Sequence, residues 1–275
     1  MADATTTRAL GRLVDIMARL RAPGGCPWDR EQTPQTLRPY LLEETYEVLD
    51  AIEHGSPAAL RDELGDLLLQ IVFHAEIARE AGQFTIADVA TAIADKLERR
   101  HPHVFGDVRV GGADDVMRNW QTIKAEERRA GGGDAGVLGG VPRALPALAR
   151  AQKVGDRLSH VGFDWRDVGA VLEVLDDERA ELAAALAAGD TVAARREVGD
   201  LLLTLASVAR HLDVSAELAL GEATDRLAAR VRHVEQAAAA AGRTLAALDP
   251  DERDRLWRDA KTATDAVSRK SASQV

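Results

Sequence analysis

The residues best suited to chemistry in this sequence are pairs of acids spaced three residues apart. Glu44 and Glu47 form one pair in "LLEETYEVLD", and Glu63 and Asp66 form another in "LRDELGDLLL". On a helix, residues i and i+3 lie on one face about a turn apart, so each pair presents two carboxylates together. Such pairs usually mark a solvated face, but here leucines follow directly and should be buried. A buried carboxylate needs a basic partner, a proton or a metal ion, and clustered acids favour the metal.

The same acid pairs recur later in the chain because the sequence repeats itself. At a shift of 134 residues, "EETYE" (43–47) falls on "DERAE" (177–181), and "ELGDLLL" (63–69) falls on "EVGDLLL" (197–203). At shifts of 130 and 137, "DKLERRHPHV" (95–104) falls on "DRLAARVRHV" (225–234), and "NWQTIK" (119–124) falls on "LWRDAK" (256–261). The order of the matches is kept throughout. The repeat predicts a duplicated helical unit.

The positions that survive between the two copies suggest what each copy binds. Basic pairs spaced i, i+4 could clamp phosphate oxygens, and a Trp four residues before a Lys could stack on a base. Each feature alone is more often a surface charge or a core residue, but together they favour a nucleotide site. The retained residues are Glu178, Glu181, Glu197 and Asp200 for the acids, Lys96, Arg100, Arg226 and Arg230 for the bases, and Trp120, Lys124, Trp257 and Lys261.

The ligand types narrow the choice of metal. Clusters with oxygen ligands alone suit Mg²⁺ or Mn²⁺, whereas zinc and di-iron sites usually include histidine or cysteine. No acid pair contains a histidine, Cys26 stands alone, and His101 and His103 are predicted to be cap or loop residues. We therefore expect Mg²⁺, with Mn²⁺ as a substitute. With no covalent nucleophile motif or phosphate-binding Gly loop, the set favours metal-assisted hydrolysis of a phosphoanhydride.

The elements that position these residues are predicted to be helices throughout. Ala, Leu, Glu and Arg dominate and only 4% of residues are aromatic, which is typical of an all-α fold. The predicted domains are residues 8–130 and 145–266, with a Gly-rich linker at 131–144 and a disordered tail at 267–275. Helical periodicity covers residues 8–21, 37–53, 58–81, 86–100 and 114–130, then 145–159 in part, 169–187, 192–211, 215–241 and 251–266.

Charge and composition exclude several classes of partner. A net charge of −10 and a pI near 5.3 argue against a general affinity for nucleic acid or for anionic membranes. No run approaches the roughly 18 apolar residues of a membrane span, and the N-terminus lacks the apolar core of a signal peptide. The single cysteine suits a reducing compartment. We expect a cytoplasmic protein with small-molecule substrates.

Several stretches of the chain resemble one known family. They resemble the MazG nucleoside triphosphate pyrophosphohydrolases in their bacterial two-copy form. The resemblance implies an all-α fold with four-helix-bundle cores, magnesium dependence, homodimers and the reaction NTP + H₂O → NMP + pyrophosphate. It also implies broad acceptance of ribo- and deoxyribonucleotides and control of non-standard or stress-linked nucleotide pools. The matching stretches are "GCPWDREQT" (25–33), "LLEETYEVLDAI" (41–52), "LRDELGDLLLQIVFHAEIA" (60–78), "DKLERRHPHVFGD" (95–107), "RAQKVGDRLSHVGFDW" (150–165) and "EVGDLLL" (197–203).

The resemblance also assigns roles to particular residues. The family's metal motif, E-x-x-E followed by E-x-x-D, falls on all eight acids named above and makes them metal ligands. The resemblance implies that the second acid set and Lys261 carry out catalysis. It also implies that the substrate is bound by Arg226, Arg230, Trp257 and Lys261 in the second copy, and by Lys96, Arg100, Trp120 and Lys124 in the first. Asp177 stands where the first copy has Glu43, and Arg226 where it has Lys96. The sequence alone therefore does not rank the copies.

Two alternatives stay open at this point. A tandem helical-bundle protein could bind metal or nucleotide without turnover, as a sensor or an interaction module. The retention of both acid sets and both Trp–Lys pairs argues against a complete loss of chemistry. The related fold also serves dUTP and phosphoribosyl-ATP hydrolysis, so the substrate could differ while the reaction type stays the same.

Overall fold

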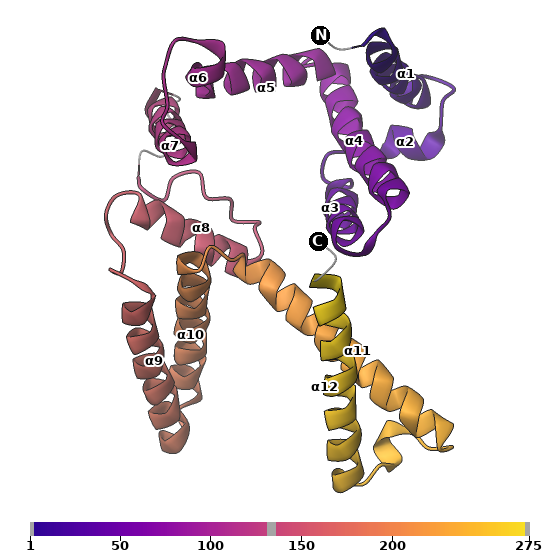
Figure 1. Ribbon diagram of the computed structural model, residues 1–275. Coiled ribbons are helices and arrows are strands. Elements are labelled where there is room, and N and C mark those ends of the chain that lie inside the picture. The colour runs from indigo at the N-terminus through magenta and orange to yellow at the C-terminus, as the bar shows by residue number, and fades with distance from the viewer. Residues whose placement is uncertain (1–2, 131–135, 273–275) are drawn as a thin grey trace. The chain divides into compact units, whose positions relative to one another are not determined.

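Helices make up the whole regular structure of the described chain. The computed structural model describes residues 3–130 and 136–272, which form twelve α-helices and one 3-10 helix, with no β-strand in these ranges (Figure 1). The all-α prediction is confirmed. None of the helices in these two ranges is both long and apolar enough to cross a membrane. The chain divides into two compact units, residues 1–127 and 128–275.

The first unit is organised around a helical hairpin. Helices α3 and α4 pack against each other, and α1 packs on α4. Buried Met17, Leu37, Val72 and Phe73 form the core between them. The helices of this unit are α1 (Ala4–Arg21), α2 (Pro27–Glu31), α3 (Arg38–His54), α4 (Pro57–Glu80), α5 (Ile86–Arg100), α6 (Pro102–Phe105) and α7 (Ala113–Ala130).

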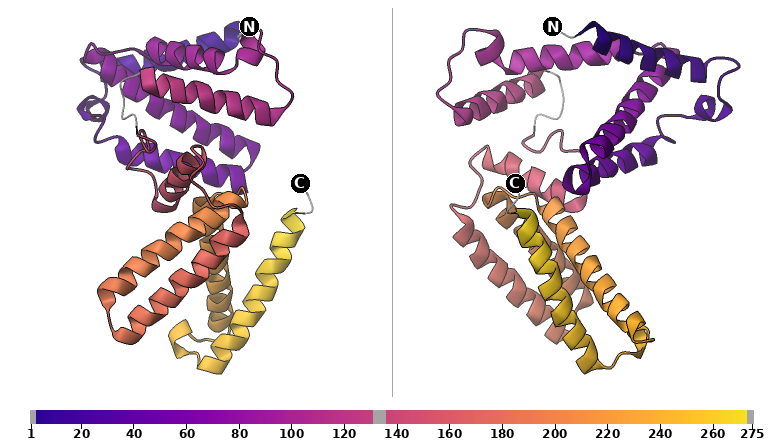
Figure 2. Two further views of the ribbon diagram at one scale, coloured as in Figure 1. Left: turned by 90° about the vertical axis from the view of Figure 1, so that its left-hand side faces the viewer. Right: turned by 45° about the vertical axis from the view of Figure 1, so that its right-hand side comes forward.

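The second unit contains two hairpins. Helices α9 and α10 form the first, with α8 packed on α10, and α11 and α12 form the second, turning through the 3-10 helix η1 (Figures 1 and 2). A small core of Val234, Ala238, Leu248 and Ala260 lies in the second hairpin. The elements are α8 (Ala147–Ser159), α9 (Val168–Ala188), α10 (Thr191–His211), α11 (Ala216–Ala240), η1 (Leu245–Ala247) and α12 (Pro250–Ala272).

Equivalent caps start the two helices that carry the second acid pair of each copy. The Ser56 side chain accepts a hydrogen bond from the Ala59 amide at the start of α4. Asp190, at the same place in the repeat, accepts from the amides of Val192 and Ala193 at the start of α10. Such caps satisfy backbone donors that a helix leaves unpaired at its N-terminus. They fix where each helix begins, and so set the acids about two turns further on.

The structure differs from the predicted elements at short helices and at the C-terminus. Helices α2, α6 and η1 are too short for a periodic pattern to reveal them. His101 caps the end of α5 and the start of α6, and His103 lies within α6. Helix α12 continues to Ala272, beyond the predicted helix end at 266, because no Gly or Pro follows Pro250. Residues 131–135 of the linker and 273–275 of the tail lie outside the described ranges.

Candidate functional site

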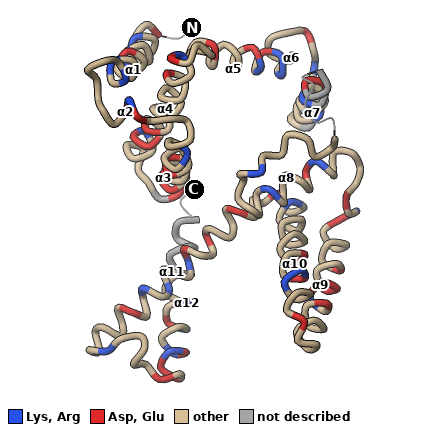
Figure 3. Tube along the Cα trace, turned by 180° about the vertical axis from the view of Figure 1, so that it is seen from behind, with Lys and Arg blue, Asp and Glu red and all other residues tan. Residues whose placement is uncertain are grey.

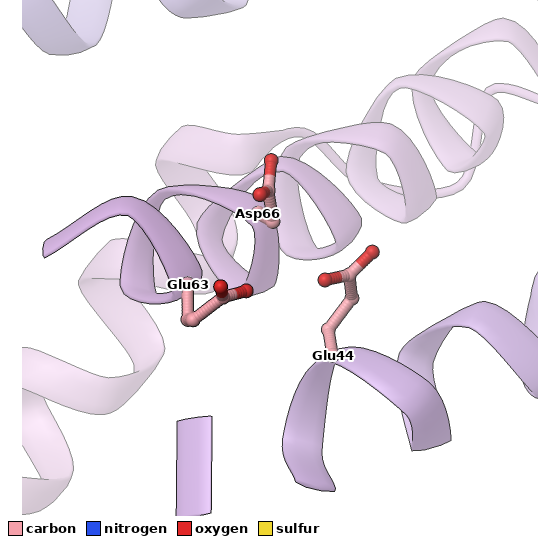
Figure 4. Close-up of side chains that lie close together, drawn as sticks. All are labelled: Glu44, Glu63 and Asp66. Atoms are coloured by element: carbon pink, nitrogen blue, oxygen red, sulfur yellow. The ribbon is translucent and has the colours of Figure 1, made fainter. Parts of the chain in front are cut away.

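Three of the four predicted acids meet in the first copy. Glu44 projects from α3 toward Glu63 and Asp66 on α4, and one carboxylate oxygen of each lies within 4.8 Å of the other two (Figure 4). The hairpin brings them together, because Glu63 and Asp66 share one face of α4. Glu47 is exposed and lies outside this group of three, although burial and then the negative charge of Glu47 raise the pKa of Glu63.

The second copy repeats this arrangement. Glu178 on α9 meets Glu197 and Asp200 on α10, again with carboxylate oxygens within 4.8 Å of one another. Glu181 is exposed and lies outside the group of three. Acidic positions recur along α3 and α9, the helices that supply the first acid pair of each copy (Figure 3). Each hairpin therefore builds the same three-carboxylate cluster from the same repeat positions.

The carboxylates in each cluster destabilise one another's charged form. Burial raises the pKa of Glu44, and the negative charges of Asp66 and Glu47 raise it further. Burial likewise raises the pKa of Glu178, followed by the charges of Asp200 and Glu181. A divalent cation among the carboxylates would remove this repulsion. The donors are carboxylate oxygens only, which fits Mg²⁺ or Mn²⁺.

The acids are less buried than the sequence predicts. Asp66 and Asp200 are exposed, while the other members of the two clusters are half-buried. Leu202 and Leu203, which follow Asp200, are 46% and 47% exposed. Consecutive leucines point around all sides of a helix, so a single packed neighbour covers only some of them. The expectation that these acids border a closed core is corrected: within one chain they lie on a partly open face.

The predicted base and aromatic residues of the first copy form a second group. The Lys124 ammonium lies 4.7 Å from the centroid of the Trp120 ring, and the Arg100 guanidinium lies 5.5 Å from it. Lys96, half-buried, lies one turn before Arg100 on α5. The Arg100 guanidinium also donates two hydrogen bonds to the Glu127 carboxylate on α7. The structure therefore brings Arg100, Trp120 and Lys124 together.

The matching residues of the second copy are arranged differently. Trp257 packs against the core of the α11–α12 hairpin and also lines a cavity of about 230 Å³. The Arg230 Nε donates to the Thr264 hydroxyl at 3.1 Å, and Arg226 pairs with Glu222 one turn earlier at 3.5 Å. Lys261 is exposed. The cavity is lined by Val231, Val234, Leu245, Arg253, Asp254 and Trp257.

Within each unit, the bases and the acid cluster lie on different helix pairs. Asp66 precedes the end of α4 by about 21 Å along the helix axis, and α5 begins only beyond that end. In the second unit α12 packs mainly against α11, which carries Arg226 and Arg230 and itself contacts α10. The bases and the acids of one copy therefore come from different helices of its unit.

Two arginines that the sequence pattern does not indicate bind acids far away in the sequence, with side chains only 6% and 12% exposed. Arg21 donates to Glu80 at 3.0 and 2.8 Å, and its guanidinium lies 5.4 Å from the centroid of the Phe73 ring. In the second unit Arg210 binds Asp164 through both terminal nitrogens, which lowers the pKa of Asp164 to about 2. Partners so far apart in sequence leave no periodic signal.

A second cavity adjoins the Arg210–Asp164 pair. Its volume is about 280 Å³, and Phe163 and Trp165 line it together with that pair. Phe163 is 74% exposed and Trp165 is 39% exposed. Gly162, in the turn after α8, has a φ of 79°, a left-handed conformation that favours glycine. The stretch "GFDW", a glycine followed by aromatics and an acid, is the signal that could have indicated it.

Comparison with known proteins agrees with this architecture. The model of the MazG nucleotide pyrophosphohydrolase domain matches residues 32–105. The chain is 46% identical over 255 residues to the nucleoside triphosphate pyrophosphohydrolase of Escherichia coli (strain K12), covering 92% of this chain and 97% of that protein. It is 41% identical over 249 residues to the nucleoside triphosphate pyrophosphohydrolase/pyrophosphatase MazG of Thermotoga maritima, covering 90% of this chain and 94% of that protein.

A third relative matches only about half of this chain. The nucleoside triphosphate pyrophosphohydrolase of Mycobacterium tuberculosis is 46% identical over 157 residues, covering 55% of this chain and 46% of that protein. The two longer matches cover nearly the whole chain, including both acid clusters. The chain belongs to the MazG nucleotide pyrophosphohydrolase family.

Proposed function

We propose that this protein hydrolyses nucleoside triphosphates between the α and β phosphates and releases a nucleoside monophosphate and pyrophosphate. The observation that carries the proposal is the three-carboxylate cluster, built at the same repeat positions in both units. It occurs in a chain 46% identical to a nucleoside triphosphate pyrophosphohydrolase over 255 residues. Control of non-standard or stress-linked nucleotide pools, in the cytoplasm, stays a prediction from the sequence.

The acids would hold Mg²⁺, with Mn²⁺ as a substitute. Bound among them, the metal would neutralise phosphate charge and polarise a phosphoryl oxygen. The residues that we propose to hold it are Glu44, Glu47, Glu63 and Asp66 in the first copy, and Glu178, Glu181, Glu197 and Asp200 in the second. Glu47 and Glu181 lie one turn from the groups of three, so each is placed either to complete the ligand set or to accept a proton from the attacking water.

The basic and aromatic residues would bind the rest of the nucleotide. Lysine and arginine side chains would orient the phosphates and stabilise the charge that develops on the leaving pyrophosphate. In the second copy these are Arg226, Arg230 and Lys261, and Trp257 offers a ring beside a cavity of about 230 Å³ for the base. In the first copy Lys96, Arg100, Trp120 and Lys124 hold the matching positions.

We also propose that residues 8–130 and 145–266 are two copies of one domain, joined by the Gly-rich segment 131–144, and that the chain forms a homodimer. Exposed apolar side chains on the acid-bearing hairpins support a dimer, including Leu64 at 48% and Val198 at 46% exposure. Gly65 and Gly199 leave open space around the helix, with no described atom within 4 Å of an added Cβ. A second chain seated there could bring its bases to these acids.

A non-catalytic sensor is the second class of function, and it is not favoured, because the relatives that match most of the chain are named as hydrolases. The test is metal-dependent turnover. We expect pyrophosphate release from nucleoside triphosphates with Mg²⁺, its loss on chelation, and its return with Mn²⁺. A panel that includes dUTP and phosphoribosyl-ATP would separate the substrate alternatives. Nucleotide binding without turnover on any member of the panel would favour the sensor.

A further inference from the structure

Glu127 on α7 holds two arginines of the first copy at once. Its carboxylate accepts two hydrogen bonds from Arg100 and one from Arg99, the latter at 2.8 Å. The side chains of Arg100 and Glu127 are only 15% and 21% exposed. Charge-assisted pairs shielded from water in this way are stronger than those on an open surface. The hydrogen bonds from the two arginines also lower the pKa of Glu127, so it is charged at neutral pH.

Arg100 also lies against Trp120, the tryptophan of the first copy. Arg100 and Lys124 both lie over the Trp120 ring, at 5.5 and 4.7 Å from its centroid. Cations placed in this way are held by the ring, and they occupy area on which a base could stack. Two nitrogens of the Arg100 guanidinium donate to the same Glu127 oxygen, Oε2, while Arg99 donates to Oε1. An anionic phosphate oxygen can accept charge-assisted hydrogen bonds from a guanidinium in the same way. Glu127 therefore satisfies Arg100 in the manner that a substrate phosphate would.

We propose that Glu127 occupies the place of a phosphate on Arg100, so that the first copy takes a triphosphate only after this carboxylate has been displaced. The proposal rests on the assignment of Arg100 to phosphate binding in the function proposed above. It makes Glu127 a specificity-determining residue that lowers the affinity of the first copy for polyphosphate. The repeat places Thr264 at this position in the second copy, where its hydroxyl accepts from Arg230. The residue at this repeat position is therefore acidic in the first copy and neutral in the second.

The test is the binding of inorganic tripolyphosphate with Mg²⁺ to the full chain, measured by titration calorimetry. We expect Glu127→Gln to bind tripolyphosphate at the first copy about tenfold more tightly than the wild type does, because the variant lacks the charged carboxylate that competes for Arg100. Glu126→Gln is the matched control, because Glu126 is exposed on the same helix and the change removes the same charge. Its binding should stay within about twofold of the wild type. Adding Arg100→Gln to Glu127→Gln should abolish the gain.

A purely structural role for Glu127 predicts a different result. If Glu127 only fastens α7 to α5, Glu127→Gln would lower the melting temperature without any gain in tripolyphosphate binding, and that outcome would overturn the proposal. A gain that persists in the double variant would overturn it too. If Glu127→Gln does not fold, Glu127→Asp keeps the charge with a shorter reach and should give a smaller gain, and no gain there would count against the proposal. Pyrophosphate release by the wild type, assayed separately, tests the proposed function independently.

Discussion

The two copies of the helical unit agree at their acids and differ at their bases. Glu44, Glu63 and Asp66 meet within 4.8 Å, and so do their counterparts in the second copy. Trp120, by contrast, is covered by two cations, one of which is also held by Glu127, whereas Trp257 lines a cavity. The acid clusters depend on one hairpin and its cap, both of which are retained. The bases lie on helices that pack differently in the two units, so their surroundings have diverged.

The largest expected difference between the copies is in turnover. We expect Glu197→Gln to reduce metal-dependent pyrophosphate release by about a hundredfold or more, because it removes a charged ligand from the second cluster. Glu63→Gln should cost much less if Glu127 keeps triphosphate out of the first copy. Steady-state rates of the two variants, with helix content checked by circular dichroism, measure this. A large loss in Glu63→Gln with full activity in Glu197→Gln would reverse the ranking of the copies.

A smaller difference is expected in nucleotide affinity. Trp257→Ala should raise KM by about tenfold, since stacking of a base on an aromatic ring is worth about 1–3 kcal/mol, while Trp120→Ala should change KM by less. Trp257 also packs against the hairpin core, so Trp257→Phe serves as the conservative control. Mn²⁺ binding, followed by spectroscopy, should change little in either variant. Equal losses of nucleotide and metal binding in Trp257→Ala would mark a structural tryptophan instead.

The Arg210–Asp164 ion pair, whose side chains are 12% and 19% exposed, should stabilise the second unit by about 1 kcal/mol, allowing for solvent screening. Arg210 lowers the pKa of Asp164 from 3.8 to about 2. For a carboxyl with a lowered pKa, the stabilisation is fully present above the unfolded pKa and is lost as pH falls from about 4 toward 2. Asp164→Asn should therefore lower the free energy of unfolding at pH 7 and change it little at pH 2. Urea titrations at both pH values check this, and an equal effect at the two pH values would contradict it.

Metal binding to the acid clusters should depend on pH in the same way in both copies. The pKa of Glu44 and that of Glu178 are both raised, so protons compete with a cation at a pH above that at which an ordinary glutamate titrates. In the metal-free protein the raised pKa values favour the fold at low pH, and this contribution is lost as pH rises through them. The increase in melting temperature on adding Mg²⁺ should therefore be largest near neutral pH and shrink on acidification. An increase that is constant down to pH 4 would argue against these ligands.

The sequence predicts the acid clusters well because local rules determine them. Spacing i, i+3 places Glu63 and Asp66 on one face, and the repeat identifies the partner helix that supplies Glu44. Caps such as Ser56 are also local, so the helix bounds are predicted to within a few residues. Glu47 and Glu181 were predicted to be metal ligands like the other six acids, and they lie outside the groups of three. Side-chain direction across the hairpin decides this, and spacing alone does not.

The rest of the site depends on contacts that sequence spacing does not encode. Glu127 reaches Arg100 across 27 positions, and Arg210 reaches Asp164 across 46. The residues of both pairs lie far apart in sequence, so neither spacing nor periodicity indicates them. The burial of the acids was overestimated for a related reason. The exposure of Leu202 depends on which elements pack against α10, and a run of leucines in the sequence does not specify those elements.

The measurement that tests the central claim most directly is the identification of products. Purified protein with Mg²⁺ and a panel of nucleoside triphosphates would be analysed by chromatography, with Glu63→Gln and Glu197→Gln alongside. We predict nucleoside monophosphate and pyrophosphate in equal amounts, lost in the variant of the working copy. Nucleoside diphosphate with inorganic phosphate, or products that both variants still form at the wild-type rate, would contradict the assignment of the acid clusters to cleavage between the α and β phosphates.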